Sequence, residues 1–256
     1  MFGRIAVFAY GVVSYCLALA TFAYLAGFMG GFLVPTWLDA PREGSLGAAL
    51  LMDILLIGVF GLQHSVMARP GFKAWWTRYV HRAAERSTYL VFSCLAMALM
   101  FWQWRPIGGV VWEVESGSLR GLVYGIYGCG WVIVLVSTFL INHFDLFGLR
   151  QVWLHLQGKE WTHLRFVTPG PYKRVRHPLY IGWMVTFWAA PTMTVAHFVF
   201  AALMTSYILV AIRYEERDLA AFHGEDYRRY RERVPMLIPR LFGHAQELPS
   251  ARNGAA

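Results

Sequence analysis

The residues Pro169-Gly-Pro-Tyr-Lys-Arg-Val-Arg-His-Pro-Leu-Tyr-Ile-Gly182 stand between two long apolar stretches of the chain. They begin as a basic loop broken by proline and glycine. A helix is predicted to start at Pro178, because proline suits the first turn of a helix. The apolar run that follows ends just before Glu215 and Glu216. A basic, aromatic segment and a pair of carboxylates are therefore expected to meet at the edge of a membrane.

The composition is that of a membrane protein. The chain has 256 residues, of which 57% are hydrophobic and 15% charged, whereas a soluble domain carries about a quarter charged residues. Apolar runs long enough to cross a bilayer predict four transmembrane helices, at 5–29, 48–67, 88–104 and 121–141. The sequence thus predicts an all-α integral membrane protein.

A fifth apolar region covers residues 179–212. One straight helix of that length would measure about 51 Å, well beyond a hydrocarbon core of about 30 Å. Pro191 breaks the region, which favours a membrane hairpin with arms at 179–190 and 192–212. Behind it, the apolar and aromatic stripe of residues 215–233 predicts a cytoplasmic amphipathic helix.

The distribution of basic residues gives the orientation. With a hairpin at the end, 20 of the 23 Lys and Arg side chains fall on one side of the membrane, and Arg42, Arg105 and Arg120 fall on the other. The positive-inside rule makes the side with more Lys and Arg cytoplasmic. Both termini are therefore expected on the cytoplasmic side of a bacterial inner membrane. Contact with anionic lipid accounts for the charge, and no nucleic-acid module accompanies it. The expected partner is membrane lipid rather than nucleic acid.

We expect residues 1–256 to form a single domain. Residues 1–141 would be its four-helix membrane region, and 142–240 would hold the cytoplasmic loop, the hairpin and a cofactor-binding region. Residues 241–256 would be a frayed tail. Asp53, near the outer end of the second span, is expected to be a helix-end carboxylate that reaches water.

Polar clusters gather at the cytoplasmic ends of three predicted transmembrane elements. The second span ends near His64, the fourth is followed by His143 and Asp145, and the fifth region is bounded by the 176–180 segment and the glutamate pair. Polar groups at this depth are costly and usually functional. The backbone N–H groups of a helix start suit a carboxylate ligand, while a glutamate can accept both hydroxyls of a ribose. No Cys/His spacing resembles a zinc site, so no metal is expected.

The run Gly170-Pro171-Tyr172 to Gly182, followed by Glu215-Glu216, Phe222-His223-Gly224 and Val234-Pro235, resembles the isoprenylcysteine carboxyl methyltransferase-like family of integral membrane methyltransferases. The resemblance implies S-adenosylmethionine as cofactor and S-adenosylhomocysteine as its product. It further implies a cofactor pocket formed by Tyr172, Arg176, His177, Pro178, Leu179, Tyr180, Gly182, Glu215 and Glu216.

Two further stretches, 61–69 and 142–152, are similar to the methanethiol S-methyltransferase branch of that family. This implies methanethiol as the small thiol substrate and dimethyl sulfide as product. A thiol is a poor nucleophile until it loses its proton. The candidate bases are Asp145 and His143, followed by His64. A dedicated base is unnecessary if the sulfonium charge of the cofactor lowers the pKa of the thiol enough.

Three other functions remain open from the sequence. The acceptor of the methyl group can instead be a prenyl-cysteine carboxylate or a lipid amine, which need a wide lateral opening. A non-enzymatic membrane protein of nitrogen-oxide metabolism would share the Gln63-His64-Ser65 region and bind no cofactor. A sterol-type reductase needs a nicotinamide site, for which this chain looks short.

Overall fold

The computed structural model describes residues 1–41, 44–162 and 164–239. The predicted frayed tail, 241–256, lies outside them. In chain order, the elements are α1 (Phe2–Gly30), α2 (Leu46–Ala68), α3 (Pro70–Trp76), η1 (Arg82–Ala84), α4 (Glu85–Gln103), β1 (Val110–Glu113), α5 (Gly117–Ile141), α6 (His143–Leu146), α7 (Leu149–Leu156), η2 (Gly170–Lys173), α8 (Pro178–Trp188), β2 (Thr192–Thr194), α9 (Val195–His223) and α10 (Glu225–Arg233).

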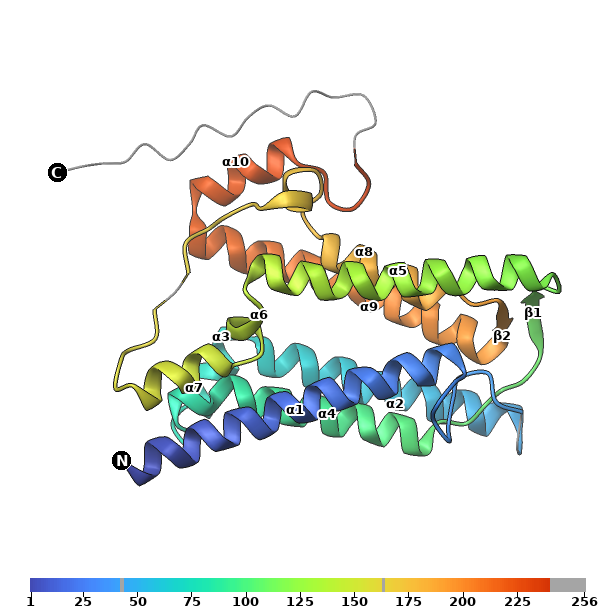
Figure 1. Cartoon of the computed structure of the whole chain (residues 1–256), viewed down its shortest axis with the longest axis horizontal. Helices are drawn as coiled ribbons and strands as arrows, with labels where there is room; N and C mark the ends of the chain where they lie inside the picture. Colours follow the sequence, from blue (N-terminus) through green and yellow to red (C-terminus); the bar gives the residue numbers. More distant parts are fainter. Residues whose placement is uncertain (42–43, 163, 240–256) are drawn as a thin grey trace.

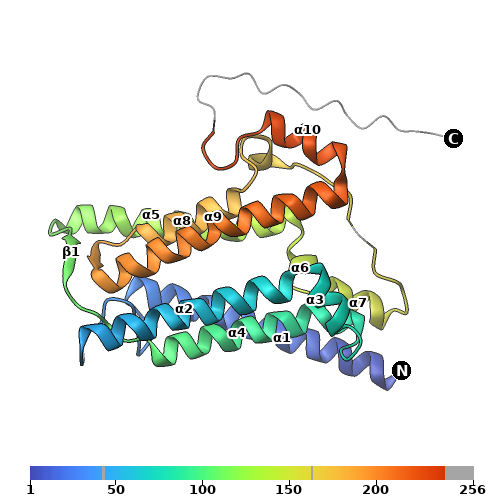
Figure 2. The ribbon, with the colours of Figure 1, turned by 180° about the vertical axis from the view of Figure 1, so that it is seen from behind.

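The long helices run side by side in two layers (Figures 1 and 2). Helices α1, α2 and α4 pack together in one layer, α5, α8 and α9 form the other, and contacts between α2 and α9 join the two. Strands β1 and β2 pair in an antiparallel sheet at one end of the layers. Helices α6, α7 and α10 lie at the opposite end. The fold is therefore mostly helical, with one small sheet that the sequence analysis does not predict.

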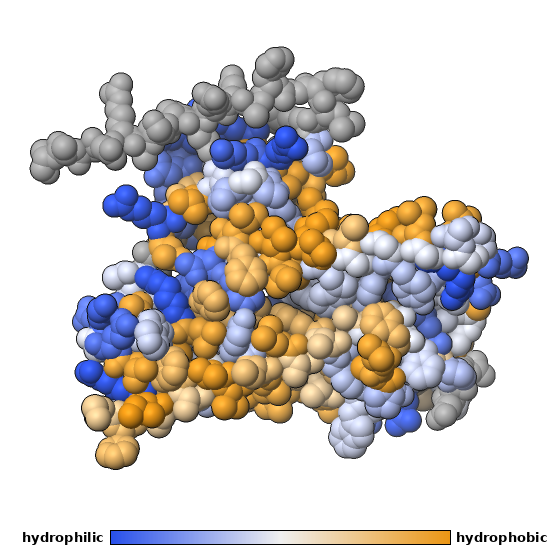
Figure 3. All heavy atoms as spheres, viewed as in Figure 1, coloured by the Kyte–Doolittle hydropathy of each residue, from blue (hydrophilic) through white to orange (hydrophobic). Residues whose placement is uncertain are grey.

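Four helices among the described residues are long and apolar enough to cross a membrane: α1, α2, α5 and α9. Their outer faces carry exposed apolar side chains, among them Leu55 and Leu62 on α2 and Val132 and Leu135 on α5. In Figure 3, hydrophobic residues cover much of the middle of the molecule, and strongly hydrophilic ones gather around α7 and α10. A surface of this kind is stable against lipid rather than water, so the protein is a membrane protein.

This set of four differs from the predicted set in one member. Helix α4, which covers all but the last residue of the predicted span 88–104, is absent from it, and α9 takes its place. Helix α4 begins with Glu85 and Arg86 and buries Ser87, Thr88 and Ser93, so it is less apolar than the four. Helix α4 packs between α1 and α2, and the hydroxyls of Thr88 and Ser93 donate to backbone carbonyls of α4 and of the turn before it. At 19 residues it remains about 28 Å long.

The C-terminal region also departs from its predicted bounds. Helices α8 and α9 pack on one another around the break at Pro191, but α9 continues through Glu215 and Glu216 to His223. The amphipathic segment 215–233 is consequently not one helix. It is divided at Gly224, whose φ of 59° lies in the region that glycine tolerates best. The last turns of α9 thus extend beyond the apolar run and carry the glutamates on a rigid helix.

Two glycines set the position of α8. A Cβ on Gly182 would lie 2.8 Å from the backbone nitrogen of Val134, and one on Gly130 would lie 3.0 Å from that of Thr186. Helices α5 and α8 therefore approach with backbone against backbone, as small residues permit in membrane helices. Gly128, two residues before Gly130 on the same helix, faces open space instead.

Asp53 does not reach water, so that prediction is wrong. The side chain is fully buried, and its Oδ1 accepts a hydrogen bond of 2.9 Å from the backbone nitrogen of Arg105. The chain leaving α4 packs over this part of α2, a long-range contact that a single helix pattern does not reveal. A buried carboxylate of this kind contributes to holding the end of α4 in place.

Candidate functional site

A cavity of about 290 Å³ lies between the ends of α5, α8 and α9, the start of α10 and the loop before η2. This volume is close to the lower end of the range for ligand pockets in proteins. Its wall combines apolar, aromatic and charged side chains from distant parts of the sequence. The polar residues among them are Arg86, Asn142, Asp145, Arg165, Thr168, Tyr172, Arg176, His177, Tyr180, Glu215, His223, Tyr227 and Tyr230.

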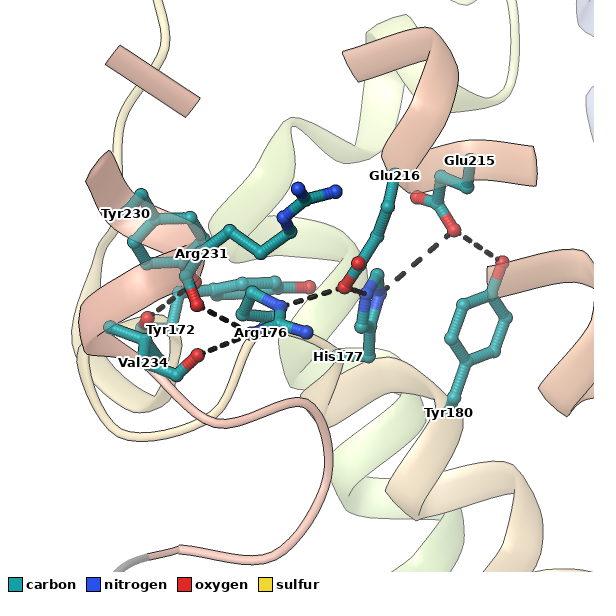
Figure 4. Close-up of polar contacts among 9 residues, drawn as sticks. All are labelled: Tyr172, Arg176, His177, Tyr180, Glu215, Glu216, Tyr230, Arg231 and Val234. Carbon is teal, nitrogen blue, oxygen red and sulfur yellow. Dashed lines mark hydrogen bonds and ion pairs between the residues drawn. The ribbon is translucent and has the colours of Figure 1, made fainter. Parts of the chain in front are cut away.

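A buried ion pair holds one side of this cavity (Figure 4). The Nε of Arg176 donates to Oε1 of Glu216 at 2.7 Å, and Nε2 of His177 donates to the same oxygen at 3.0 Å. Both side chains of the Arg176–Glu216 pair are 11% exposed. Nη1 of Arg176 donates to the backbone carbonyls of Arg231 and Val234. This cluster ties the start of α8 to α9 and to the segment that follows α10.

The two adjacent glutamates have different surroundings. Glu215 lines the cavity, whereas Glu216 is turned into the ion pair and is not part of the cavity wall. The hydroxyl of Tyr180 donates to Oε2 of Glu215 at 2.7 Å, and Nδ1 of His177 lies 3.9 Å from that oxygen. The side chain of Glu215 is 42% exposed. Its carboxylate can therefore still accept hydrogen bonds from a ligand, and that of Glu216 is already used.

Tyrosines from η2 and α10 also line the cavity. The hydroxyl of Tyr230 donates to the backbone carbonyl of Tyr172 at 2.6 Å. The hydroxyl oxygens of Tyr172 and Tyr227 are both buried; that of Tyr172 has the hydroxyl of Ser137 as its neighbour, and that of Tyr227 has no hydrogen-bond partner among the described residues. Burial raises the pKa of both tyrosines above the usual value, so both stay protonated. An unpaired buried hydroxyl is costly, and a polar ligand in the cavity would relieve that cost.

Asp145 lies at the cavity wall in the short helix α6. The chain turns sharply at Asn142, whose φ is 131° and whose side-chain oxygen accepts from the backbone nitrogen of Asp145 at 3.0 Å. Oδ1 of Asp145 accepts from Arg150 Nη1 and from Trp161 Nε1, each at 2.9 Å. The side chain is 22% exposed. The carboxylate is therefore fixed in direction, and the residue lies in the cavity wall.

His143 is placed differently from Asp145 although it is only two residues away. It is buried, and it is not part of the cavity wall. Nδ1 donates to the hydroxyl of Thr138 at 2.8 Å, because that hydroxyl itself donates to the carbonyl of Leu135, and Nε2 accepts from the hydroxyl of Tyr15 at 2.8 Å. Burial lowers the pKa of His143. The ring joins α1, α5 and α6, and both of its nitrogens are occupied.

His64 is also outside the cavity wall. The hydroxyl of Ser93 donates to the carbonyl of Tyr89, so Ser93 accepts from Nδ1 of His64 at 3.2 Å. The hydroxyl of Tyr89 then donates to Nε2 at 2.8 Å. The ring also stacks on Phe60, with centroids 5.2 Å apart. Of the three candidate bases, only Asp145 is placed at the cavity.

The structure brings together most of the residues expected to bind a cofactor. Tyr172, Arg176, His177, Leu179, Tyr180 and Glu215 line one cavity. Pro178 begins α8 and is buried, Gly182 packs against α5, and Glu216 lies behind the wall in the ion pair.

The sequence analysis does not predict Arg86, Asn142, Tyr227 and Tyr230 as site residues, although all four line the cavity. Tyr227 and Tyr230 are three residues apart on α10 and were interpreted as part of an amphipathic stripe. That spacing cannot distinguish a face toward lipid from a face toward a ligand. Within 1–41, 44–162 and 164–239, no group of three His, Cys, Asp or Glu side chains is placed to hold a metal ion.

Comparison with known proteins assigns the family. A methanethiol S-methyltransferase of Crocosphaera subtropica is 56% identical over 236 residues, which cover 92% of this chain and 92% of that protein. The chain belongs to the methanethiol S-methyltransferase family. A methanethiol S-methyltransferase of Mycobacterium tuberculosis is 47% identical over 90% of this chain and 94% of its own length. Nurim of Mus musculus is 28% identical over 75% of this chain and 76% of its own length. No family model and no solved structure matches the chain.

Proposed function

We propose that the protein transfers the methyl group of S-adenosylmethionine to methanethiol, giving dimethyl sulfide and S-adenosylhomocysteine. Its membership of the methanethiol S-methyltransferase family carries this proposal. The cavity beside α8 and α9 supports it, because that cavity offers charged, aromatic and apolar groups within one small volume. The acceptor is small and apolar, and the donor is charged, so both kinds of surface are needed.

The residues of the cavity fit the cofactor. The carboxylate of Glu215 suits the ribose hydroxyls, and its charge offsets the sulfonium. The hydroxyl of Tyr227 lacks a partner among the described residues, and together with the hydroxyl of Tyr172 it is suited to the polar edge of a nucleoside. Leu179 is the second residue of α8, where a backbone N–H has no partner within the helix. That N–H, together with His177, suits the amino-acid carboxylate of the cofactor.

In this proposal Arg176, Pro178, Gly182 and Glu216 act through position rather than through contact. The Arg176–Glu216 pair fixes the first turn of α8 relative to α9. Gly182 lets α8 lie directly against α5. Because the residues that would hold the donor are on rigid helices, the donor can be aligned with an acceptor without further ordering.

When bound, the cofactor supplies a methyl group on a positively charged sulfur. The thiol would attack that carbon in line, so that the new carbon–sulfur bond would form as the bond to the sulfonium breaks, and the electron pair of the broken bond would stay on the sulfur of S-adenosylhomocysteine. The chain contributes alignment and the exclusion of water by its aromatic wall. The proton of the thiol leaves to Asp145 or to water. Asp145 is the best-placed of the candidate bases because it lies at the cavity wall.

We further propose that this cavity lies at the cytoplasmic boundary of a bacterial inner membrane. The hairpin of α8 and α9 would enter the bilayer from that side, with both termini and the amphipathic α10 in the cytoplasm. The excess of Lys and Arg on the same side supports this orientation. No metal is required for the reaction, and the other partner of the protein is membrane lipid rather than nucleic acid.

The experiment uses the full chain purified in detergent. S-adenosylmethionine is titrated by calorimetry, and methanethiol is then added while dimethyl sulfide is measured by gas chromatography. We expect binding of the cofactor and formation of dimethyl sulfide. Absence of heat would reject any methyltransferase function. Binding without dimethyl sulfide would reject methanethiol as acceptor and favour a prenyl-cysteine carboxylate or a lipid amine.

Glu215→Gln and Glu225→Gln form a matched pair for the cofactor site. Glu225 is exposed on α10 and pairs with Arg228 on the surface, so its replacement removes the same charge away from the cavity. Glu215→Gln should weaken cofactor affinity about tenfold, which is about 1.4 kcal/mol, and Glu225→Gln should not. Equal affinities of the two variants would contradict the placement of the cofactor beside Glu215.

A further inference from the structure

Arg86 reaches the cavity from the side opposite α8 and α9. It is the second residue of α4 and is half-buried, and it lines the cavity. Its Nε donates to the backbone carbonyl of Leu146 at 2.9 Å, and its guanidinium carbon lies 5.6 Å from the centre of the Tyr89 ring. A hydrogen bond and a cation–π contact thus fix the direction of the guanidinium.

The charge of Arg86 is not neutralised by an ion pair within the part of the chain that the structure describes. Three other arginines near this end of the molecule have carboxylate partners: Arg69 pairs with Asp218, Arg150 with Asp145, and Arg176 with Glu216. Among the described residues, Arg86 donates a hydrogen bond through its Nε, and its two terminal nitrogens remain for other acceptors. A half-buried cation in a cavity wall favours an anionic ligand.

The surroundings of Arg86 lead from the cavity toward the membrane. The ring under its guanidinium is Tyr89, whose hydroxyl binds His64, and His64 stacks on Phe60. These three residues lie on α2 and α4, farther along the helices than the cavity. Arg86 therefore lies between the cavity and a cluster of aromatic side chains packed on α2 and α4.

We propose that the guanidinium of Arg86 binds the sulfur of the thiol substrate and stabilises it as the thiolate. This inference rests on the proposed function. The S–H bond breaks with its proton passing to water or to Asp145, and the freed electron pair on sulfur forms the bond to the methyl carbon. The bond from that carbon to the sulfonium breaks, and its electrons stay with the departing thioether. Arg86 is unchanged in the step, because a guanidinium cannot act as the base at neutral pH.

The other charged and titratable groups that face this position are accounted for. They are Glu85 and Tyr89 on α4, Lys73 on α3, His64 on α2, Asp145 on α6, and Tyr180 and Glu215 across the cavity. Asp145 is held by Arg150 and Trp161, and Glu215 accepts from Tyr180. Lys73 has the same sign of charge as Arg86. Arg165 also lines the cavity but is exposed, so Arg86 is the half-buried cation there whose guanidinium has no carboxylate partner among the described residues.

The test compares Arg86→Gln, Arg86→Lys and the control Arg82→Gln. Arg82 is an exposed arginine four residues away, so its replacement removes the same charge without touching the cavity. Affinity for S-adenosylmethionine is measured by calorimetry, and kcat/KM for methanethiol is measured from about pH 7 to about pH 9. Arg86→Gln should keep the cofactor affinity within about twofold and lose about tenfold or more in kcat/KM at neutral pH. The loss should shrink as the pH rises, because bulk thiol then ionises unaided.

A binding measurement gives a readout independent of turnover. Methanethiol is titrated into the complex with S-adenosylhomocysteine, which cannot react, in two buffers with different heats of ionisation. If the wild type binds thiolate, each binding event releases a proton, and the apparent heat differs between the buffers. Arg82→Gln and Arg86→Lys should behave like the wild type, whereas Arg86→Gln should release fewer protons.

Three results would overturn this assignment of Arg86. If Arg86→Gln behaves like Arg82→Gln in every measurement, the proposal is rejected. A loss of S-adenosylmethionine affinity with unchanged proton release would place the guanidinium on the cofactor instead. If Arg86→Gln does not fold, the test compares the wild type with Arg86→Lys. The proposal is then rejected if the two proteins have the same pH profile and neither releases a proton when methanethiol binds. Failure of the wild type to form dimethyl sulfide rejects the proposed function itself.

Discussion

Replacing Glu216 by glutamine should damage the fold, whereas the same change at Glu215 should damage cofactor binding. Glu216 is 8% exposed and accepts from both Arg176 and His177. Removing one partner of a buried ion pair costs about 3–5 kcal/mol. Arg176 keeps the carbonyls of Arg231 and Val234 as acceptors, so we expect the lower end of that range.

A loss of about 3 kcal/mol corresponds to a fall of about 6–12 °C in the apparent melting temperature of a chain of this size. Glu215→Gln loses only part of one hydrogen bond, from Tyr180, at a partly exposed position. That change costs about 1 kcal/mol, or about 2–4 °C. The two variants should thus differ clearly in stability, although they differ by one position in the sequence.

The assay is thermal unfolding of the wild type and both variants in the same detergent, followed by tryptophan fluorescence. Calorimetric titration with S-adenosylmethionine below the unfolding temperature gives the affinities. The reasoning is refuted if Glu216→Gln melts with the wild type, or if Glu215→Gln melts as early as Glu216→Gln. Either result would mean that the ion pair with Arg176 does not hold α8 against α9.

Further predictions concern packing, pH and the base. Gly182→Ala should lower stability by about 1–3 kcal/mol through overpacking against α5, whereas Gly128→Ala, with open space around its Cβ, should not; equal melting temperatures would contradict the close contact. Because burial lowers the pKa of His143, the unfolded chain binds more protons below about pH 6.5. Stability should therefore fall as the pH drops from about 7.5 to about 5.5, and less steeply in His143→Gln; parallel pH profiles of unfolding would exclude this contribution. Asp145→Asn should lower kcat for methanethiol while cofactor affinity, measured by calorimetry, stays within about twofold; wild-type turnover near neutral pH would remove Asp145 as the base.

Much of the fold follows from local patterns. Hydrophobic runs predict α1, α2, α4 and α5 to within a few residues, and Pro191 predicts the break between α8 and α9. The end of α9 is harder to predict, because the apolar run stops near residue 212 while the helix continues to His223. Helix propensity and the contact with α10 maintain that extension, and neither depends on apolar periodicity. The β1–β2 pair is equally hidden, because it joins segments far apart in the chain.

The candidate site shows the same division. The sequence predicts that the 176–180 segment meets the glutamate pair, and the hydrogen bonds of Tyr180 to Glu215 and of His177 to Glu216 confirm this proximity. It cannot tell the two glutamates apart, because neighbouring residues on a helix point about 100° from each other and only the neighbouring helices determine which one is buried. His143 and Asp145 are likewise adjacent in the pattern, yet packing occupies both nitrogens of one and leaves the other at the cavity.

The bonds between Arg176 and the chain beyond α10 have a consequence for how the protein is made. The backbone nitrogens of Arg176 and His177 donate to the carbonyls of Pro235 and Met236, and the side chain of Arg176 is bound by Val234. Helices α1 to α8 precede these residues in the chain, so they emerge from the ribosome first and can fold while synthesis continues. A nascent chain can thus be inserted in its membrane while its cavity is still incomplete. Assembly of the cavity ends when the last residues of α10 and those just after it bind Arg176 and His177.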